Sequence, residues 1–186
     1  GYAFPKLRPG RKVIVTEFEH HSNYVPWQQA AKRAGAEFVV IPRKGDLLDL
    51  SVLERELDKN TVMLSVTAVS NVTGTRMPLE RIIPMAHDYG IPVCVDASQA
   101  MRHGGIDVKK LDCDFLAFSG HKMMGPGGTG VLYGKKEYLE QMEPVRFGGG
   151  MVDQVGREDT TFGDIPYRFE AGTPNYPGSI ALAKAM

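Results

Sequence analysis

The sequence has few cysteines, no excess of charge of either sign and no long apolar run, and each absence narrows what the protein can be. Its 186 residues include two cysteines, 22 lysines and arginines, and 22 aspartates and glutamates. Two cysteines in unlike contexts form no disulfide framework and suit a reducing compartment. Balanced charge gives no signal for binding nucleic acid or a membrane surface. Because no apolar run approaches a bilayer span and residues 1–9 lack a signal-peptide core, we expect a cytoplasmic protein.

Short apolar strands alternate with amphipathic helices along the chain, a pattern that indicates an α/β protein. Because the strands are apolar throughout, we expect a mostly parallel sheet with helices on both faces. The length suits one domain spanning residues 1–186. We predict strands at 12–16, 37–42, 61–69, 92–96, 114–119 and 130–134, and helices at 22–34, 51–58, 79–89 and 135–142.

Local features add three predictions. Ser51 is placed to cap the helix that begins there. The charges between Asp107 and Asp114 fit a solvated helix and turn. Residues 147–175 contain glycines and scattered charges without a period, which predicts a long loop or an arm toward a partner subunit.

One segment, from Phe118 to Gly130, places a lone lysine between the end of an apolar strand and a run of glycines. An amine at the end of a buried strand is partly desolvated, which disfavours the charged form. A neutral amine attacks an aldehyde, so Lys122 is suited to form a Schiff base. The glycines would let the backbone approach a flat cofactor. The same residues also fit a glycine-rich turn with an exposed lysine.

A second apolar strand ends in Asp96, about one β-α-β unit before Lys122. Two successive strands would bring this carboxylate and the amine to the same sheet edge, where open α/β sheets bind ligands. A pyridoxal phosphate enzyme needs such a pair. The lysine holds the cofactor aldehyde, and the carboxylate keeps the pyridine nitrogen protonated. Asp96 also fits a helix N-cap.

Two more predicted strands end in polar residues. His20 follows the first strand and could lie flat on a cofactor ring and move protons. No cluster of Cys, His or Asp stands at ligand spacing beside the His20-His21 pair, so we predict no metal site. Asn71 follows another strand and could hydrogen-bond a substrate carboxylate or a ring oxygen. Alternatively, Asn71 forms an Asx turn that Gly74 closes.

In this order and spacing, the segments resemble the class V aminotransferase fold, the large domain of pyridoxal phosphate-dependent transferases of the aspartate aminotransferase type. The resemblance is strongest to the cysteine desulfurase and selenocysteine lyase branch, which serves iron–sulfur cluster assembly. It covers nearly the whole chain and rests on residues 19–23, 25–28, 69–74, 95–100, 111–115, 119–122 and 169–175.

The resemblance implies a homodimer that binds pyridoxal 5′-phosphate, takes cysteine or selenocysteine as its amino acid substrate and passes sulfur to an acceptor protein. The nearest rival within the enzymes is another class V reaction. The alternative outside the enzymes is a non-catalytic folded fragment that binds the cofactor weakly.

The resemblance also implies roles around the cofactor ring. Lys122 corresponds to the Schiff-base lysine that later acts as general base, and Asp96 to the carboxylate at the pyridine nitrogen. His20 corresponds to the histidine stacked on the ring. Gln99 corresponds to a residue that hydrogen-bonds the ring hydroxyl, and Asn71 to an asparagine near that hydroxyl and the substrate carboxylate.

The phosphate and the sulfur chemistry complete what the resemblance implies. Ser119 and His121 correspond to phosphate-binding residues, and Thr173 to a residue that reaches the phosphate of the other subunit's cofactor. The family's Gly-Thr phosphate loop, persulfide-forming cysteine and carboxylate-binding arginine have no counterpart in these 186 residues. Cys94 and Cys113 are expected to be structural. We therefore expect this chain to be an inactive core, incomplete at both ends, that self-associates and binds cofactor weakly.

Overall fold

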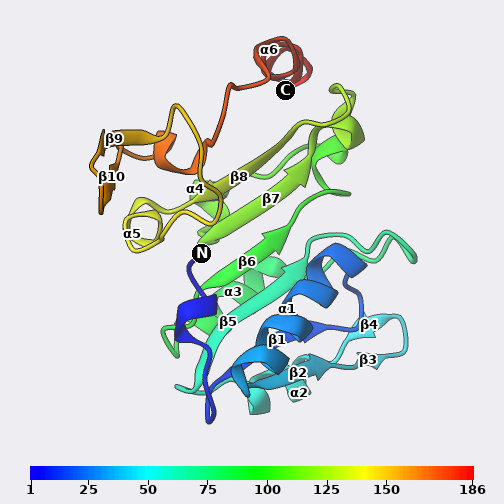
Figure 1. The fold of residues 1–186 in the computed structure, drawn as a ribbon. Coiled ribbons are helices and arrows are strands. Elements are labelled where there is room, and N and C mark those ends of the chain that lie inside the picture. Colours follow the sequence, from blue (N-terminus) through cyan, green and yellow to red (C-terminus); the bar gives the residue numbers. More distant parts are fainter.

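A six-stranded sheet forms the centre of the computed structural model, which describes all residues 1–186 (Figure 1). Its strand order is β2-β1-β5-β6-β7-β8. All neighbouring strands pair in parallel except β8, which runs antiparallel to β7. The predicted mostly parallel sheet is therefore confirmed. The strands are β1 (Lys12–Thr16), β2 (Glu37–Ile41), β5 (Thr61–Thr67), β6 (Val93–Asp96), β7 (Phe115–Ser119) and β8 (Gly130–Gly134).

Helices cover both faces of the sheet, with α1 on one face and α3 on the other (Figure 1). No helix is both long enough and apolar enough to cross a membrane. The α-helices are α1 (His21–Ala34), α2 (Leu50–Glu56), α3 (Leu79–His87), α4 (Val108–Leu111), α5 (Lys136–Leu139) and α6 (Tyr176–Ala185). The 3₁₀ turns are η1 (Phe4–Lys6), η2 (Met101–His103), η3 (Gly120–Met123) and η4 (Tyr167–Phe169).

Strand β1 is buried along its whole length, and its successive side chains enter two different cores. Ile14 packs in the larger core, which includes Leu53 of α2 and Ile82 of α3. Val13 packs in the smaller core, which includes Ala31 of α1. Each fully buried side chain of this size contributes about 1.5–3 kcal/mol. Burial on both sides explains why the central residues of the strand are apolar, whereas Lys12 and Thr16 at its two ends are buried polar residues.

Two local predictions need correction. Helix α2 begins one residue earlier than expected, and its N-cap is Asp49 rather than Ser51. The Asp49 carboxylate accepts the backbone N–H groups of Ser51 and Val52 at 3.0 and 3.3 Å. The Asp49 carboxylate thus satisfies two of the free N–H groups at the helix start, and its charge lies favourably at the positive end of the helix dipole.

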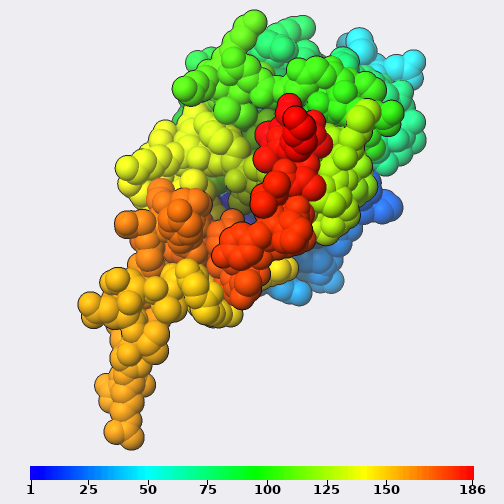
Figure 2. All heavy atoms as spheres, turned by 90° about the horizontal axis from the view of Figure 1, so that it is seen from above, coloured from blue at the N-terminus to red at the C-terminus, as the bar shows by residue number.

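Residues 147–175 lie mostly outside regular helices and strands, and their role as a long loop or an arm toward a partner subunit stays a prediction. They contain an antiparallel hairpin of β9 (Val152–Val155) and β10 (Thr160–Phe162), which projects from the body of the protein (Figure 2). Strand β9 is exposed throughout, so its residues show no apolar alternation that the sequence could reveal. A second small hairpin, β3 (Arg43–Lys44) with β4 (Leu47–Leu48), was also not predicted.

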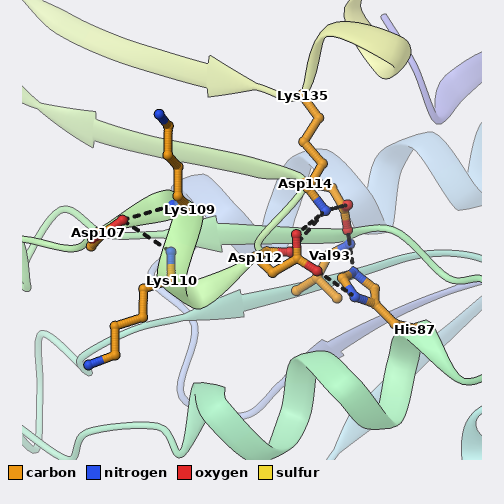
Figure 3. Close-up of polar contacts among 8 residues, drawn as sticks. All are labelled: His87, Val93, Asp107, Lys109, Lys110, Asp112, Asp114 and Lys135. Atoms are coloured by element: carbon orange, nitrogen blue, oxygen red, sulfur yellow. Dashed lines mark hydrogen bonds and ion pairs between the residues drawn. The ribbon is translucent and has the colours of Figure 1, made fainter.

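At the end of the sheet where β6 and β7 begin, the buried carboxylate of Asp114 joins three segments of the chain (Figure 3). The side chain of Asp114 is only 1% exposed, and it contacts His87 Nε2 and Lys135 Nζ at 2.8 Å each. It also accepts the backbone N–H of Val93 at 2.7 Å. Asp112 contacts the same two side chains, but its own side chain is 64% exposed. The charges of this stretch therefore do not all lie on a solvated helix and turn, because Asp114 is part of the core.

The two aspartates provide a matched test of this cluster. Asp114→Asn should lower the free energy of unfolding by about 3 kcal/mol, because it removes the buried charge that pairs with Lys135 and contacts His87. Asp112→Asn should lower it by less than about 1 kcal/mol, because the lost pair is exposed to water. Urea denaturation of the cofactor-free protein measures both changes. Equal effects of the two substitutions would contradict the assignment of Asp114 as the anchor.

Candidate functional site

The predicted site residues collect at one edge of the sheet because four neighbouring strands end there. His20 follows β1 and Asn71 follows β5, while Asp96 is the last residue of β6. Ser119 is the last residue of β7, and Lys122 lies in the turn η3 directly after it. Ligands of open parallel sheets bind at this carboxyl end of the strands.

Lys122 lies beside a cavity of about 380 Å³. Several other lysines are held in ion pairs, among them Lys12, Lys135 and Lys136, whereas Lys122 lines the cavity without one. The sequence prediction placed Gln99 and His121 near Lys122, and both line this cavity. It missed the other three lining residues, Arg102, His103 and Met124. Arg102 and His103 belong to η2, a short turn without the apolar periodicity from which the sequence could predict it.

The glycines on either side of Lys122 serve internal packing more than access to a ligand. A Cβ on Gly120 would meet the Thr129 hydroxyl, and a Cβ on Gly125 would lie 2.7 Å from Leu182 of α6. By contrast, Gly127 has open space where its Cβ would stand. The loop is therefore close-packed under α6, and only its outer part is open.

Asp96 keeps one carboxylate oxygen free of protein contacts. Its Oδ1 accepts the backbone N–H of Ser98 at 2.9 Å in a turn, but no helix begins there and Ala100 is the N-cap of η2, so the alternative role of Asp96 as a helix N-cap is wrong. Oδ2 forms no hydrogen bond within the protein. The residue therefore both fixes the turn after β6 and offers an unpaired acceptor to a ligand.

His20 is exposed and occupies the N-cap position of α1. Its Nδ1 accepts the backbone N–H of Ser22 at 3.2 Å and lies 2.7 Å from the Ser22 hydroxyl. The neutral imidazole that satisfies this contact carries its proton on Nε2. The cap thus orients the ring and leaves Nε2 without a hydrogen-bond partner in the protein.

Asn71 does not form the predicted Asx turn. The hydroxyl of Ser70 holds the turn instead, because it accepts the N–H groups of Val72 and Thr73 at 3.3 and 3.4 Å. Gly74 closes the loop as predicted, with φ of 71° and a backbone bond to Ser70. The Asn71 side chain is exposed and remains available to a ligand.

The predicted phosphate ligands lie in different places. Ser119 is half-buried at the end of β7, and His121 is exposed beside the cavity. Thr173 is exposed between η4 and α6 and does not line this cavity. No group of three or more His, Cys, Asp or Glu side chains is arranged to hold a metal ion.

A buried carboxyl that the sequence prediction missed, Glu19, lies directly before His20. It accepts hydrogen bonds from the Thr16 hydroxyl at 2.6 Å, the Thr67 N–H at 2.9 Å and the Asn23 amide at 2.6 Å. Burial raises the pKa of Glu19 to about 7 against the effect of these bonds, and the charge of Asp96 raises it further. The only sequence signal was a glutamate at the end of a buried strand.

Neither cysteine has the environment of a reactive thiol. Burial raises the pKa of Cys94 to about 12 and that of Cys113 to about 11. A thiol in this range is protonated at neutral pH, whereas the thiolate is the nucleophile.

Comparisons with known proteins agree along the whole chain. Residues 1–186 match the aminotransferase class-V family. The chain is 46% identical over 186 residues to a probable cysteine desulfurase of Halalkalibacterium halodurans, covering all of this chain and 46% of that protein. It resembles the solved structure of the cysteine desulfurase CsdA from Escherichia coli with a TM-score of 0.95 and 45% identity, over 99% of this chain and 46% of that one.

A more distant solved structure is that of a C-DES mutant with glycine covalently linked to its PLP cofactor. It is 25% identical, with a TM-score of 0.86 over 99% of this chain and 51% of that one. The chain therefore spans about half the length of the relatives it matches.

Glu19 gives the stability of the fold a pH dependence of defined sign. Its pKa is about 7 in the fold against an ordinary value of 4.5, so between these values the folded protein holds a proton that the unfolded chain has released. Its contribution to the free energy of unfolding is complete below about pH 4.5 and is lost as the pH rises through 7. We expect Glu19→Gln to remove this decrease in the free energy of unfolding with rising pH. Urea denaturation of the cofactor-free protein at about pH 5 and about pH 8 measures it.

Glu17→Gln is the control for this measurement. Glu17 lies at the same strand end, but it is exposed and pairs with Arg43 at the surface. Its substitution should leave the difference between the two pH values unchanged. The assignment fails if Glu19→Gln keeps the pH dependence of the unaltered protein.

Proposed function

Because this chain belongs to the class V aminotransferase family, as its motifs predicted, we propose that the protein carrying it is a pyridoxal phosphate-dependent cysteine desulfurase. The fold is that of the large domain of pyridoxal phosphate-dependent transferases, and the chain is homologous to cysteine desulfurases. One observation supports the activity most. The Lys122 amine lines a cavity with Gln99, which follows Asp96 at the adjoining strand end.

The chemistry of the side chains at this edge fits the cofactor. Bound pyridoxal phosphate supplies an aldehyde and a ring that accepts electrons. Lys122 would hold the aldehyde, and the free oxygen of Asp96 would hold the proton on the ring nitrogen through a charge-assisted hydrogen bond. The remaining contacts would come from His20 on the ring face, Asn71 and Gln99 at the ring hydroxyl, Ser119 and His121 at the phosphate, and Thr173 at the phosphate of the partner subunit's cofactor.

The residues of this chain would also carry the proton transfers. Lys122 Nζ would take the proton from the α-carbon of bound cysteine, acting as general base. His20 Nε2 has no hydrogen-bond partner in the protein, because the α1 cap uses Nδ1, and it would give or take a proton at the substrate. Asn71 would fix the substrate carboxylate, so that the α-carbon lies near Lys122.

The sulfur acceptor is best sought outside these 186 residues. Cys94 and Cys113 are unsuitable because burial raises the pKa of both thiols. We propose that another thiol of the whole protein takes the sulfur as a persulfide and leaves alanine. Transfer to an acceptor protein for iron–sulfur cluster assembly, a cytoplasmic location and a homodimer, with residues 147–175 as the arm between subunits, are parts of the same proposal.

The assignment of Lys122 can be tested by labelling. Borohydride reduction of the whole protein with pyridoxal phosphate should attach the cofactor to Lys122, as read by peptide mass mapping. Lys122→Ala should abolish this label and the visible absorbance band of the bound cofactor. Lys136→Ala is the control, because Lys136 is an exposed lysine on α5. Labels spread over surface lysines with none on Lys122 would overturn the assignment.

The activity and the role of Asp96 can be tested together. With cysteine and a thiol reductant, the whole protein should form alanine and sulfide in equal amounts. Asp96→Asn should keep the fold and slow alanine formation about 100-fold, because the charge that would hold the ring proton is lost. Alanine is measured by chromatography and sulfide by a colorimetric assay.

Asp46→Asn is the matched control, since Asp46 is an exposed aspartate in the turn between β3 and β4. It should leave the rate unchanged. Selenocysteine in place of cysteine tests the lyase alternative through the ratio of the two rates. Pyruvate in place of alanine, or an unchanged rate in Asp96→Asn, would contradict the proposal.

A further inference from the structure

Three segments of the proposed active site meet at one partly buried side chain, that of Glu19. The Thr16 hydroxyl reaches it from the end of β1, the Thr67 N–H from the end of β5, and the Asn23 amide from the first turns of α1. The three donor–acceptor distances are 2.6, 2.9 and 2.6 Å. The carboxyl therefore joins two strand ends to the start of a helix.

The surrounding hydrogen bonds require an acceptor at both oxygens of Glu19. Asn23 Oδ1 already accepts the Ser65 hydroxyl at 2.7 Å and the Trp27 indole N–H at 3.2 Å, so its NH₂ group faces Glu19. The Thr16 hydroxyl accepts the Phe18 N–H at 3.1 Å, which leaves its own proton for Glu19. A glutamine would turn an NH₂ group toward another donor, and an unsatisfied buried donor is costly.

His20 is held between these contacts. It directly follows Glu19, and its carbonyl accepts the N–H of Asn23 at 2.8 Å. Asn23 in turn donates its side-chain amide to Glu19. The backbone on both sides of His20 is thus tied to one carboxyl, which is itself tied to β5 through Thr67. Precise placement of a group against a reacting centre requires such a supporting layer.

We propose that Glu19 is a positioning residue of the active site. The Glu19 carboxylate fixes the His20 ring at the sheet edge where Asp96 and Lys122 lie. The inference rests on the proposed function. It assigns Glu19 no contact with substrate or cofactor. Its effect passes through His20, and a displacement of about 1 Å at such a group can slow a reaction about 100-fold.

One readout needs no cofactor. In the cofactor-free protein with ¹³C-labelled histidine, the ring resonances of His20 can be assigned among the five histidines with a His20→Gln variant. Glu19→Gln should shift and broaden the His20 resonances. Glu17→Gln, the exposed control at the same strand end, should leave them unchanged. Unchanged His20 resonances in Glu19→Gln would overturn the inference.

The second readout uses the protein with pyridoxal phosphate bound. Glu19→Gln should reduce the visible circular dichroism per bound cofactor and lower kcat by about 10-fold or more, with Lys122 still labelled by borohydride. Glu19→Asp keeps the charge on a shorter side chain and should recover part of the circular dichroism and part of kcat. If Glu19→Gln does not fold, Glu19→Asp alone should still show a smaller change of the same sign.

The outcomes separate the two proposals. A role limited to stability would lower the unfolding midpoint of Glu19→Gln but leave its circular dichroism per cofactor and its kcat intact, and this would refute the inference. Failure of the proposed function would appear already in the unaltered protein, as no Lys122 label and no visible band. The His20 resonances would still decide the positioning role in that case.

Discussion

Parallel pairing of β5, β6 and β7 sets Thr67, Asp96 and Ala117 side by side across the sheet. Everything at the candidate site depends on this register. A shift of one residue would turn each strand's side chains to the opposite face and would separate Asp96 from Lys122. The register is held by apolar burial on both faces of the sheet, because the same strands contribute to two cores. The stability of the fold and the geometry of the site therefore share one origin.

The two ends of the sheet each bury a carboxylate, with opposite electrostatics. Asp114 has a lysine and a histidine within 2.8 Å, so its charge is compensated. The hydrogen-bond donors of Glu19 are all neutral, and the nearby charge of Asp96 is of the same sign. The end of the sheet with Asp114 is thus held together by compensated charges that stabilise the fold. The other end has the carboxyl group of Glu19, whose pKa of about 7 makes its protonation respond to small changes around it.

The local sequence pattern determined the α/β class, most strand positions and the residues at the strand ends. Apolar runs marked β1, β5, β6 and β7 within a few residues, because burial on both faces favours apolar side chains at successive positions. The motifs around Lys122 and Asp96 led to the class V aminotransferase family, which the match over residues 1–186 confirms. The roles given to individual site residues remain proposals.

Only the tertiary structure decided which polar groups are buried and which short strands form. Asp114 and Asp112 look alike in the sequence, yet Lys135 and His87 reach the first in the core and the second at the surface. The burial of Glu19 depends on Thr67, which lies 48 positions away in the chain. The hairpin of β9 and β10 is solvated and so leaves no apolar period. Local patterns record which side chains avoid water, whereas the partners of a buried charge are set by contacts between distant segments.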